Sequence, residues 1–254
     1  MLEAAFWGLA AASTLLLGAA LAIAVPWSRR AIGLVAGFGA GALIAAVTLD
    51  LTASAFAAAG IPAVTVGLAL GATAFSLGNL LIHRGGPARH RKRSHGRQKE
   101  DPLGILLGTI LDGIPESVVI GISLLAGEGI GVAFLAAVAI SNLPEAIAST
   151  TGLRAPHDPS RPAGPGNAPA WSVRRVMLLW LAVVLLSAVA AGLGYGLLAG
   201  APPVVAATIQ AFAAGAVLAM LADTMMPEAF EDAGQAVGVV TVLGYAIATL
   251  LTLA

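Results

Sequence analysis

The chain contains no cysteine and few charged or aromatic residues. Of its 254 residues, 10% are charged and 5% are aromatic, whereas 58% are hydrophobic and the mean hydropathy is +0.92. Without cysteine, the chain can form neither a disulfide framework nor a thiolate metal site. The scarcity of charge excludes a soluble domain of this length and indicates an integral membrane protein. The 31 glycines are expected where helix backbones approach closely within a membrane.

Apolar segments of about 20 residues, the length that a helix needs to cross a bilayer, recur along the whole chain. They cover 3–25, 31–58, 62–83, 102–126, 129–153, 173–199, 203–227 and 235–254. The sequence therefore predicts an all-α integral membrane protein with eight transmembrane helices in a single domain, 1–254. Close helix contacts are predicted where glycines recur four residues apart, at Gly33, Gly37 and Gly41 and at Gly104 and Gly108.

The basic residues mark one side of this predicted bundle. All thirteen Lys and Arg fall in or beside the loops that follow odd-numbered spans, seven of them in 84–101. Under the positive-inside rule these loops are cytoplasmic, so both termini are expected outside, and a bacterial inner membrane is the expected location. The polar loops at 84–101 and 154–172 are predicted to be disordered. Because the first of these loops contains His90 and His95, it could capture metal ions. We favour the alternative that its basic residues anchor the chain at anionic lipid.

Two related motifs place acids inside the predicted spans. Residues 112–117 (DGIPES) lie in the fourth span and 141–146 (SNLPEA) in the fifth. An ionised side chain at that depth costs about 3 kcal/mol, so such residues usually face a polar pathway. Because proline has no N–H, each motif also leaves a backbone carbonyl without its helical donor one turn before the glutamate. Acids and free carbonyls in two broken helices predict an intramembrane cation site.

The spans contain several acids without a basic partner. These acids are Asp50, Asp112, Glu116, Glu145 and Asp223. A single membrane acid can be a protonated carboxyl group bonded to a neighbouring helix, but five together make that interpretation weak. Asp112 and Glu116 are four residues apart, as are Ser141 and Glu145, so each pair shares a helix face. Oxygen ligands of this kind suit divalent cations.

These features resemble the ZIP (Zrt-, Irt-like protein) family of divalent-metal transporters. The resemblance covers the eight-span topology and the cytoplasmic loop after the third span, and it is sharpest in spans four, five and seven. It implies a ZIP-like helical bundle with a two-metal centre in the fourth and fifth helices. The first metal would contact Asp112, Glu116, Ser141 and Glu145. The second would lie near Glu116, Asn142, Glu145 and Asp223.

The chain departs from the family pattern at three of these positions. Asp112 stands where the family generally has histidine, Gly113 where it has asparagine, and Ser141 where histidine is frequent. The loss of imidazole is expected to weaken zinc relative to harder ions such as Mn²⁺ and Fe²⁺, although the general affinity order still favours zinc. Since glycine has no side chain, the second metal position is expected to be the weaker one.

Two acids lie outside the fourth and fifth spans. Asp223 opens 223–228 (DTMMPE), a third version of the motif, and is predicted to form another wall of the site. Asp50 stands where the family has polar residues along the metal path, and the resemblance makes it a further metal residue. Equally open is a packing hydrogen bond from Asp50 to Thr48 or Thr52 of its own helix.

We therefore expect a transporter, not an enzyme, that moves a divalent metal toward the cytoplasm by motion of one helix bundle past another. Zinc is the expected substrate, with iron, manganese or cadmium as alternatives. The expected partners are the metal cation and the lipid bilayer, with a homodimer as a further option and no nucleic acid. A non-transporting metal sensor or a proton-conducting relative is an alternative function. An intramembrane aspartyl enzyme is disfavoured, because the chain has no Gly-x-Gly-Asp sequence.

Overall fold

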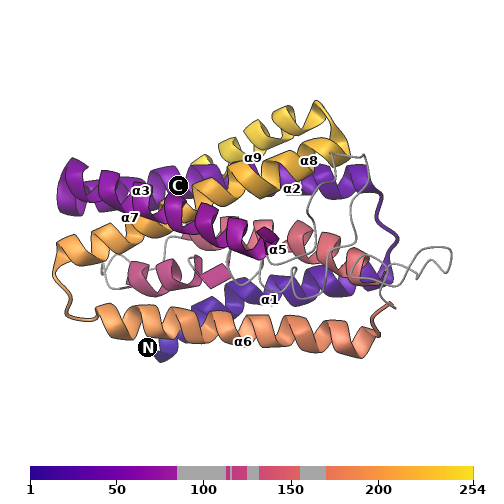
Figure 1. The fold of residues 1–254 in the computed structure, drawn as a ribbon, viewed down its shortest axis with the longest axis horizontal. Helices are drawn as coiled ribbons and strands as arrows, with labels where there is room; N and C mark the ends of the chain where they lie inside the picture. The colour runs from indigo at the N-terminus through magenta and orange to yellow at the C-terminus, as the bar shows by residue number, and fades with distance from the viewer. Residues whose placement is uncertain (85–112, 115, 125–131, 155–169, 254) are drawn as a thin grey trace.

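A computed structural model describes the chain at 1–84, 113–114, 116–124, 132–154 and 170–253. Throughout these residues the regular structure is helical and no strand occurs, which confirms the predicted all-α class (Figure 1). Several predicted features lie outside the described residues. They are Asp112, Pro115, the glycines at 104 and 108, the rest of 102–112, and most of the two polar loops.

Where the chain is described, the helices follow the predicted apolar segments; most of 102–126 and the start of 129–153 lie outside the described residues. The elements are α1 (Leu2–Ala24), α2 (Arg29–Ala46), the π-helical turn η1 (Val47–Thr52), α3 (Ala53–Arg84), α5 (Val132–Leu153), α6 (Val173–Leu198), α7 (Pro203–Met220), the π-helical turn η4 (Leu221–Met225), α8 (Met226–Ala233) and α9 (Ala236–Leu253). A further helical segment covers 116–123. Within α3 the helix is broken at Gly60, whose φ of 71° favours glycine, so the boundary predicted between the second and third apolar segments is confirmed.

The described helices suit a membrane. By length and composition, four segments of the described chain could cross one: Leu2–Ala24, Arg29–Leu81, Val173–Leu198 and Pro203–Ala233. Large apolar side chains such as Leu185 and Val189 on α6 and Leu250 on α9 are exposed on the outside of the bundle. Apolar faces of this extent would be costly in water, so the fold is that of a helical, membrane-embedded protein.

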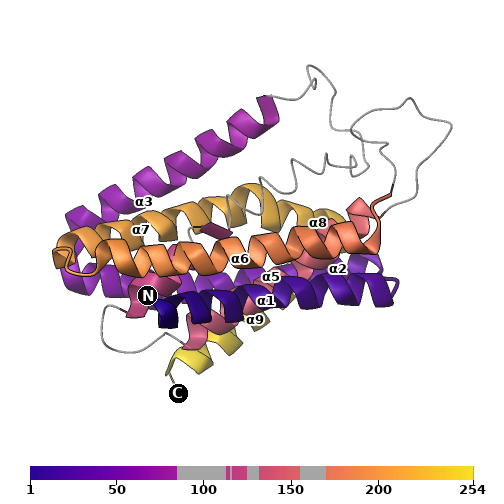
Figure 2. The ribbon, with the colours of Figure 1, turned by 90° about the horizontal axis from the view of Figure 1, so that it is seen from below.

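The helices pack as two groups, which Figure 1 shows one above the other. The α1 bundle comprises α1, 116–123, α5 and α6, and the α2 bundle comprises α2, α3, α7, α8 and α9. In the first, α1 packs on α5 and α6; in the second, α3 packs on α7, and α2 packs on α8 and α9. The main contact between the bundles is that of α2 with α5. Figure 2 shows α3 diverging from the other helices toward its C-terminal end.

Glycines set the distance between neighbouring helices. A Cβ atom on Gly41 of α2 would overlap the backbone carbonyl of Thr241 on α9, and one on Gly244 of α9 would overlap the backbone of α2. Gly33 and Gly37 contact α8 and α9 in the same way. The close contact predicted for this glycine series is therefore confirmed, and it lets backbone atoms pack directly against each other.

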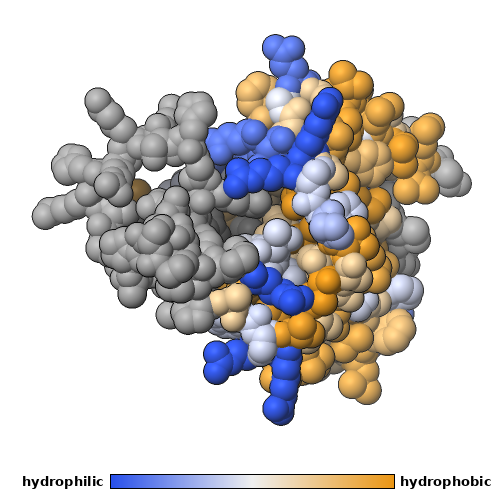
Figure 3. All heavy atoms as spheres, turned by 90° about the vertical axis from the view of Figure 1, so that its right-hand side faces the viewer, coloured by the Kyte–Doolittle hydropathy of each residue, from blue (hydrophilic) through white to orange (hydrophobic). Residues whose placement is uncertain are grey.

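Five of the described arginines gather at one end of the bundle. Figure 3 looks onto the end where α2 and α6 begin, and hydrophilic side chains cluster there. The arginines at this end are Arg29 and Arg30 at the start of α2, Arg154 after α5, and Arg174 and Arg175 in the first turn of α6. Both termini lie toward the opposite end in Figure 1. These five arginines, from three loops of the sequence, thus share one end of the described bundle.

Candidate metal site

The polar motif of the fifth apolar segment lies in the middle of α5. Pro144 is buried inside this helix, where its missing N–H leaves the carbonyl of Ile140 without the usual donor. Asn142 is 6% exposed, and its Nδ2 donates to the backbone carbonyl of Ala11 on α1 at 3.3 Å. Because this bond occupies the donor end of the amide, the acceptor Oδ1 is left to face the interior.

The second buried acid-bearing segment is 116–123. Glu116 is 5% exposed, and the neighbouring Ser117 donates from Oγ to the backbone carbonyl of Gly113 at 2.7 Å. Glu116 lines the same cavity as Glu145 of α5. Two carboxylates repel each other strongly in a medium of low dielectric constant, and a cation between them would reverse the sign of that interaction.

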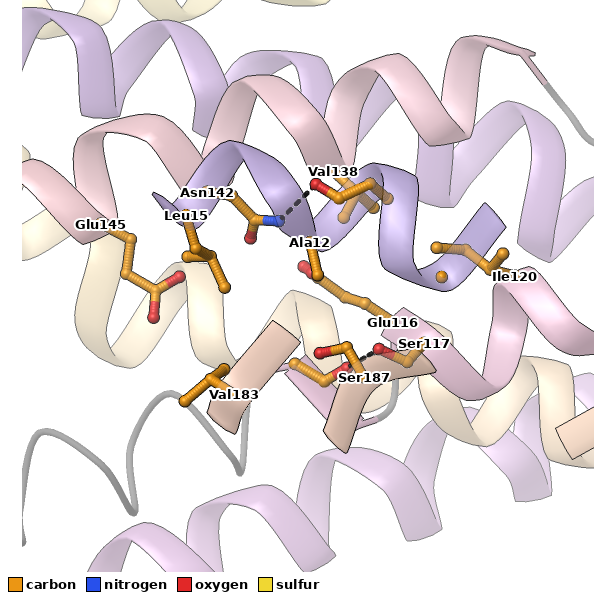
Figure 4. Close-up of a pocket in the computed structure, with 13 residues that line it drawn as sticks. Ala12, Leu15, Glu116, Ser117, Ile120, Val138, Asn142, Glu145, Val183 and Ser187 are labelled. Carbon is orange, nitrogen blue, oxygen red and sulfur yellow. Dashed lines mark hydrogen bonds between the residues drawn. The ribbon is translucent and has the colours of Figure 1, made fainter. Parts of the chain in front are cut away.

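Glu116, Asn142 and Glu145 line one small cavity, which Figure 4 shows between their helices. Its volume is about 10 Å³, near the lower limit for holding one water molecule. The wall is completed by apolar and small residues of α1 and α6. A space of this size accommodates a single ion or water molecule but not an organic substrate.

The contributions of α1 and α6 were not predicted from the sequence. From α1, Ala11 accepts the Asn142 hydrogen bond and lines the cavity with Gly8, Ala12 and Leu15. From α6, the buried Ser187 lines the cavity opposite Gly113, where a Cβ atom on the glycine would be 3.9 Å from the serine Oγ. The only available signal was that Ser187 interrupts a long apolar run.

Two of the predicted metal residues lie outside this cavity. Ser141 is buried, but its Oγ donates to the carbonyl of Val138 in its own helix at 2.9 Å. Asp223 is exposed in η4 and accepts a hydrogen bond from Ser76 Oγ of α3 at 3.3 Å. The structure therefore brings together Glu116, Asn142 and Glu145 without these two. Asp112 lies outside the described residues, although the adjacent Gly113 lines the cavity.

Asp50 also lies apart from the cavity, in η1. Its Oδ2 is buried and has no hydrogen-bond partner among the described residues. The alternative, a hydrogen bond from Thr48 or Thr52 to Asp50, is not formed. The hydroxyls of both threonines donate instead to carbonyls of their own helix, at 2.7 and 2.9 Å. Asp50 therefore neither lines the cavity nor receives the hydroxyl of Thr48 or Thr52 that the packing alternative predicted.

Asp50 and Asp223 share an unexpected local structure. Each lies in a π-helical turn, η1 or η4, that interrupts an otherwise α-helical segment. Such turns insert one extra residue into the helix and often occur at functional positions. Each turn is also polar within an apolar helix, since Thr48 and Thr52 flank Asp50 and Thr224 follows Asp223.

Within the described part of the chain, no group of three or more His, Asp or Glu side chains is arranged to hold a metal ion. The described cavity offers two carboxylates, one amide oxygen and the hydroxyls of Ser117 and Ser187. The sequence matches no protein-family model and no curated protein. The case for a metal site therefore rests on the chemistry of these oxygen donors and on their convergence in one buried space.

Proposed function

We propose that the chain is a divalent-metal transporter of the ZIP type with eight membrane spans, carrying metal toward the cytoplasm. The observation that carries the proposal is the convergence of Glu116, Glu145 and Asn142 on one cavity inside an apolar bundle. No Lys or Arg is among the described residues that line this cavity. Two acids without a basic partner at this depth are best stabilised by a bound cation.

The donor set and the size of the cavity support a metal ion as the substrate. Carboxylate, amide and hydroxyl oxygens bind Mn²⁺, Fe²⁺, Zn²⁺ and Cd²⁺, and the general affinity order places zinc above manganese and iron. The volume of about 10 Å³ suits a bare or nearly bare ion. We infer that zinc is the main substrate, with selectivity weaker than a histidine-containing site would give.

The division into two bundles supports transport rather than static binding. The cavity lies within the α1 bundle, between α1, 116–123, α5 and α6, while α2 and α5 form the main contact with the α2 bundle. Sliding of one bundle past the other would carry the cavity toward each side of the membrane in turn. A site buried within one rigid group is the arrangement that such a movement requires.

The orientation follows from the arginine-rich end. Arg29, Arg30 and Arg174 are exposed where α2 and α6 begin. Because cytoplasmic loops carry an excess of Lys and Arg, we assign this end to the cytoplasm and both termini to the outside of a bacterial inner membrane. Eight crossings satisfy this assignment with every basic residue of the chain on one side.

Uptake by reconstituted protein tests the proposal. Proteoliposomes loaded with a metal-sensitive dye should accumulate Zn²⁺, and more weakly Cd²⁺, Fe²⁺ and Mn²⁺. Glu116→Gln and Glu145→Gln should each abolish uptake, because each removes a charge from the cavity while keeping the side-chain size. Glu231→Gln is the matched control, since this acid is exposed on α8. Uptake that survives both cavity variants contradicts the proposal.

The same preparation separates the alternative functions. Calorimetric zinc binding without any uptake would identify a sensor. A change of internal pH without metal, abolished by Glu116→Gln, would identify a proton pathway through the same acids. Either result would keep the cavity as the functional site but replace metal transport as its function.

A further inference from the structure

Three arginines lie where α5 ends and α6 begins. Arg174 and Arg175 are in the first turn of α6, and both are exposed. The backbone N–H of Trp171 donates to the carbonyl of Leu153 at 3.0 Å, so the last residue of α5 lies beside the chain that enters α6. Arg154, which is half-buried, follows directly after Leu153. We call Arg154, Arg174 and Arg175 the α6 arginines.

The helices around the α6 arginines contribute no acid. α6 contains neither Asp nor Glu, and α5 has none after Glu145. α1, which packs on both helices, has a single acid, Glu3, in its first turn at the opposite end of the bundle (Figure 1). Positive charge that neighbouring helices do not offset attracts an anion, and the planar guanidinium group matches a phosphate in particular.

An exposed apolar stripe runs along α6 from the next turn onward. Its members are three or four residues apart and therefore share one face of the helix. They are Leu178, Leu181, Leu185 and Val189, and each is between 42% and 54% exposed. At about 1.5 Å per residue, this α6 stripe is about 16 Å long. That is close to half of the hydrocarbon core of about 30 Å, so the stripe has the length of one lipid leaflet.

The start of α2 carries the same charge at the same end but lacks these features. Arg29 and Arg30 are exposed in its first turn, yet no residue of α2 after Arg30 is exposed. α8, which contains three acids, packs against this helix. A Cβ atom on Gly33, one turn after Arg29, would lie 2.9 Å from the Cβ of Asp232. These two arginines thus have acids on a neighbouring helix and no open apolar face below them.

We propose that the start of α6 binds an anionic phospholipid, with the phosphate at the α6 arginines and an acyl chain on the α6 stripe. The half-buried Trp171 lies beside the arginines in sequence, and tryptophan favours the level of the lipid headgroups. A free phosphate would satisfy only the charge, and a neutral lipid would satisfy only the stripe. The anionic phospholipid satisfies both. This site is separate from the metal cavity, and it is independent of metal transport.

Native mass spectrometry of the detergent-solubilised protein tests the charge. Phosphatidylglycerol should bind at least about tenfold more tightly than phosphatidylcholine with the same acyl chains. The double change Arg174→Gln with Arg175→Gln should weaken phosphatidylglycerol binding by about tenfold or more, because each arginine contributes to the attraction. Arg29→Gln with Arg30→Gln is the matched control, and its affinity should stay within about threefold of the wild type. Equal losses in both double variants, or equal binding of the two lipids, would overturn the site.

A second pair of variants tests the stripe. Leu181→Asn should weaken phosphatidylglycerol binding by about fivefold or more, because a polar side chain then interrupts the surface for the acyl chain. Leu250→Asn is the control, since Leu250 is 68% exposed on α9, in the other bundle. It should bind the lipid as the wild type does. Soluble glycerol phosphate at the same concentration should not displace the lipid. Displacement by it, or unchanged affinity in Leu181→Asn, would show that the α6 arginines bind a phosphate without the stripe and would overturn the phospholipid site.

Discussion

Asn142 of α5 donates a hydrogen bond from Nδ2 to the backbone carbonyl of Ala11 on α1, at 3.3 Å. The bond orients the amide so that its oxygen is left for the cavity, and it connects the motif-bearing helix to a helix without polar residues at the site. One amide thus links α5 to α1 through its nitrogen and lines the cavity.

Replacing Asn142 by Ala should lower zinc affinity by about tenfold, or 1.4 kcal/mol, because one neutral oxygen ligand is lost. The adjacent Ser141→Ala is the control, since the hydroxyl of Ser141 donates to Val138 and does not line the cavity. Its affinity should match that of the wild type in isothermal titration. A larger loss in Ser141→Ala than in Asn142→Ala would place the metal on the side of α5 that faces α2.

The sequence predicts the helices well because their main signal is local. Each apolar segment needs only its own residues to form a helix, and the break at Gly60 needs only a glycine followed two residues later by Pro62. The glycine series from Gly33 to Gly41 also predicts a close contact, although not that α8 and α9 supply the partner. Which helices meet depends on side-chain fit across the whole bundle, and no single segment contains that information.

The site is predicted only in part, for a related reason. Glu116, Asn142 and Glu145 converge as their motifs indicate, because an acid in an apolar helix faces the interior. The rotation of each helix is decided by packing, however, and it turns Ser141 toward its own backbone and Asp223 toward Ser76. The π-helical turns matter here, since one inserted residue changes the face on which every later side chain lies.

Neutralising one acid of the cavity should stabilise the metal-free protein. Glu116 is buried in the apolar interior beside the cavity, so Glu116→Gln removes the cost of burying an ionisable carboxyl group without creating a space. The unfolding temperature without metal should rise by about 2–4 °C for each kcal/mol relieved, and the further rise on adding zinc should disappear. Thermal unfolding in detergent measures both effects. A fall in the metal-free unfolding temperature would show that Glu116 makes a stabilising contact instead.

Metal selectivity should respond to the two residues that replace the His-Asn of the ZIP pattern. Among the described residues, the nearest atom to a Cβ built on Gly113 is Ser187 Oγ at 3.9 Å, so they leave space for a larger side chain. Imidazole nitrogen favours zinc over harder ions, so Asp112→His with Gly113→Asn should raise the zinc-to-manganese affinity ratio by about tenfold. Gly113→Ala alone should leave the ratio unchanged. An unchanged or lower ratio in the double variant would mean that Asp112 does not contact the metal.

The orientation of the chain is testable because each introduced cysteine is the only one present. Ile61 is exposed just after the break at Gly60, and Arg174 is exposed at the arginine-rich end. In intact cells an impermeant maleimide should label the Ile61→Cys protein, and it should label Arg174→Cys only after permeabilisation. The reverse pattern would invert the assignment and, with it, the proposed direction of transport.

The contact between α2 and α9 can be tested with two glycines of one helix. A Cβ atom on Gly244 would overlap the backbone carbonyl of Phe38 on α2, whereas one on Gly238 would meet nothing within 4 Å. Replacing glycine by alanine within a helix stabilises the protein by about 0.5–1 kcal/mol. This gain in stability is the same for both variants, so it cancels when they are compared. Overpacking costs about 1–3 kcal/mol, and Gly244→Ala should therefore unfold at a lower temperature than Gly238→Ala in the same detergent. Equal stability of the two variants would mean that α9 does not pack on α2, and the arrangement of the whole α2 bundle would have to be revised.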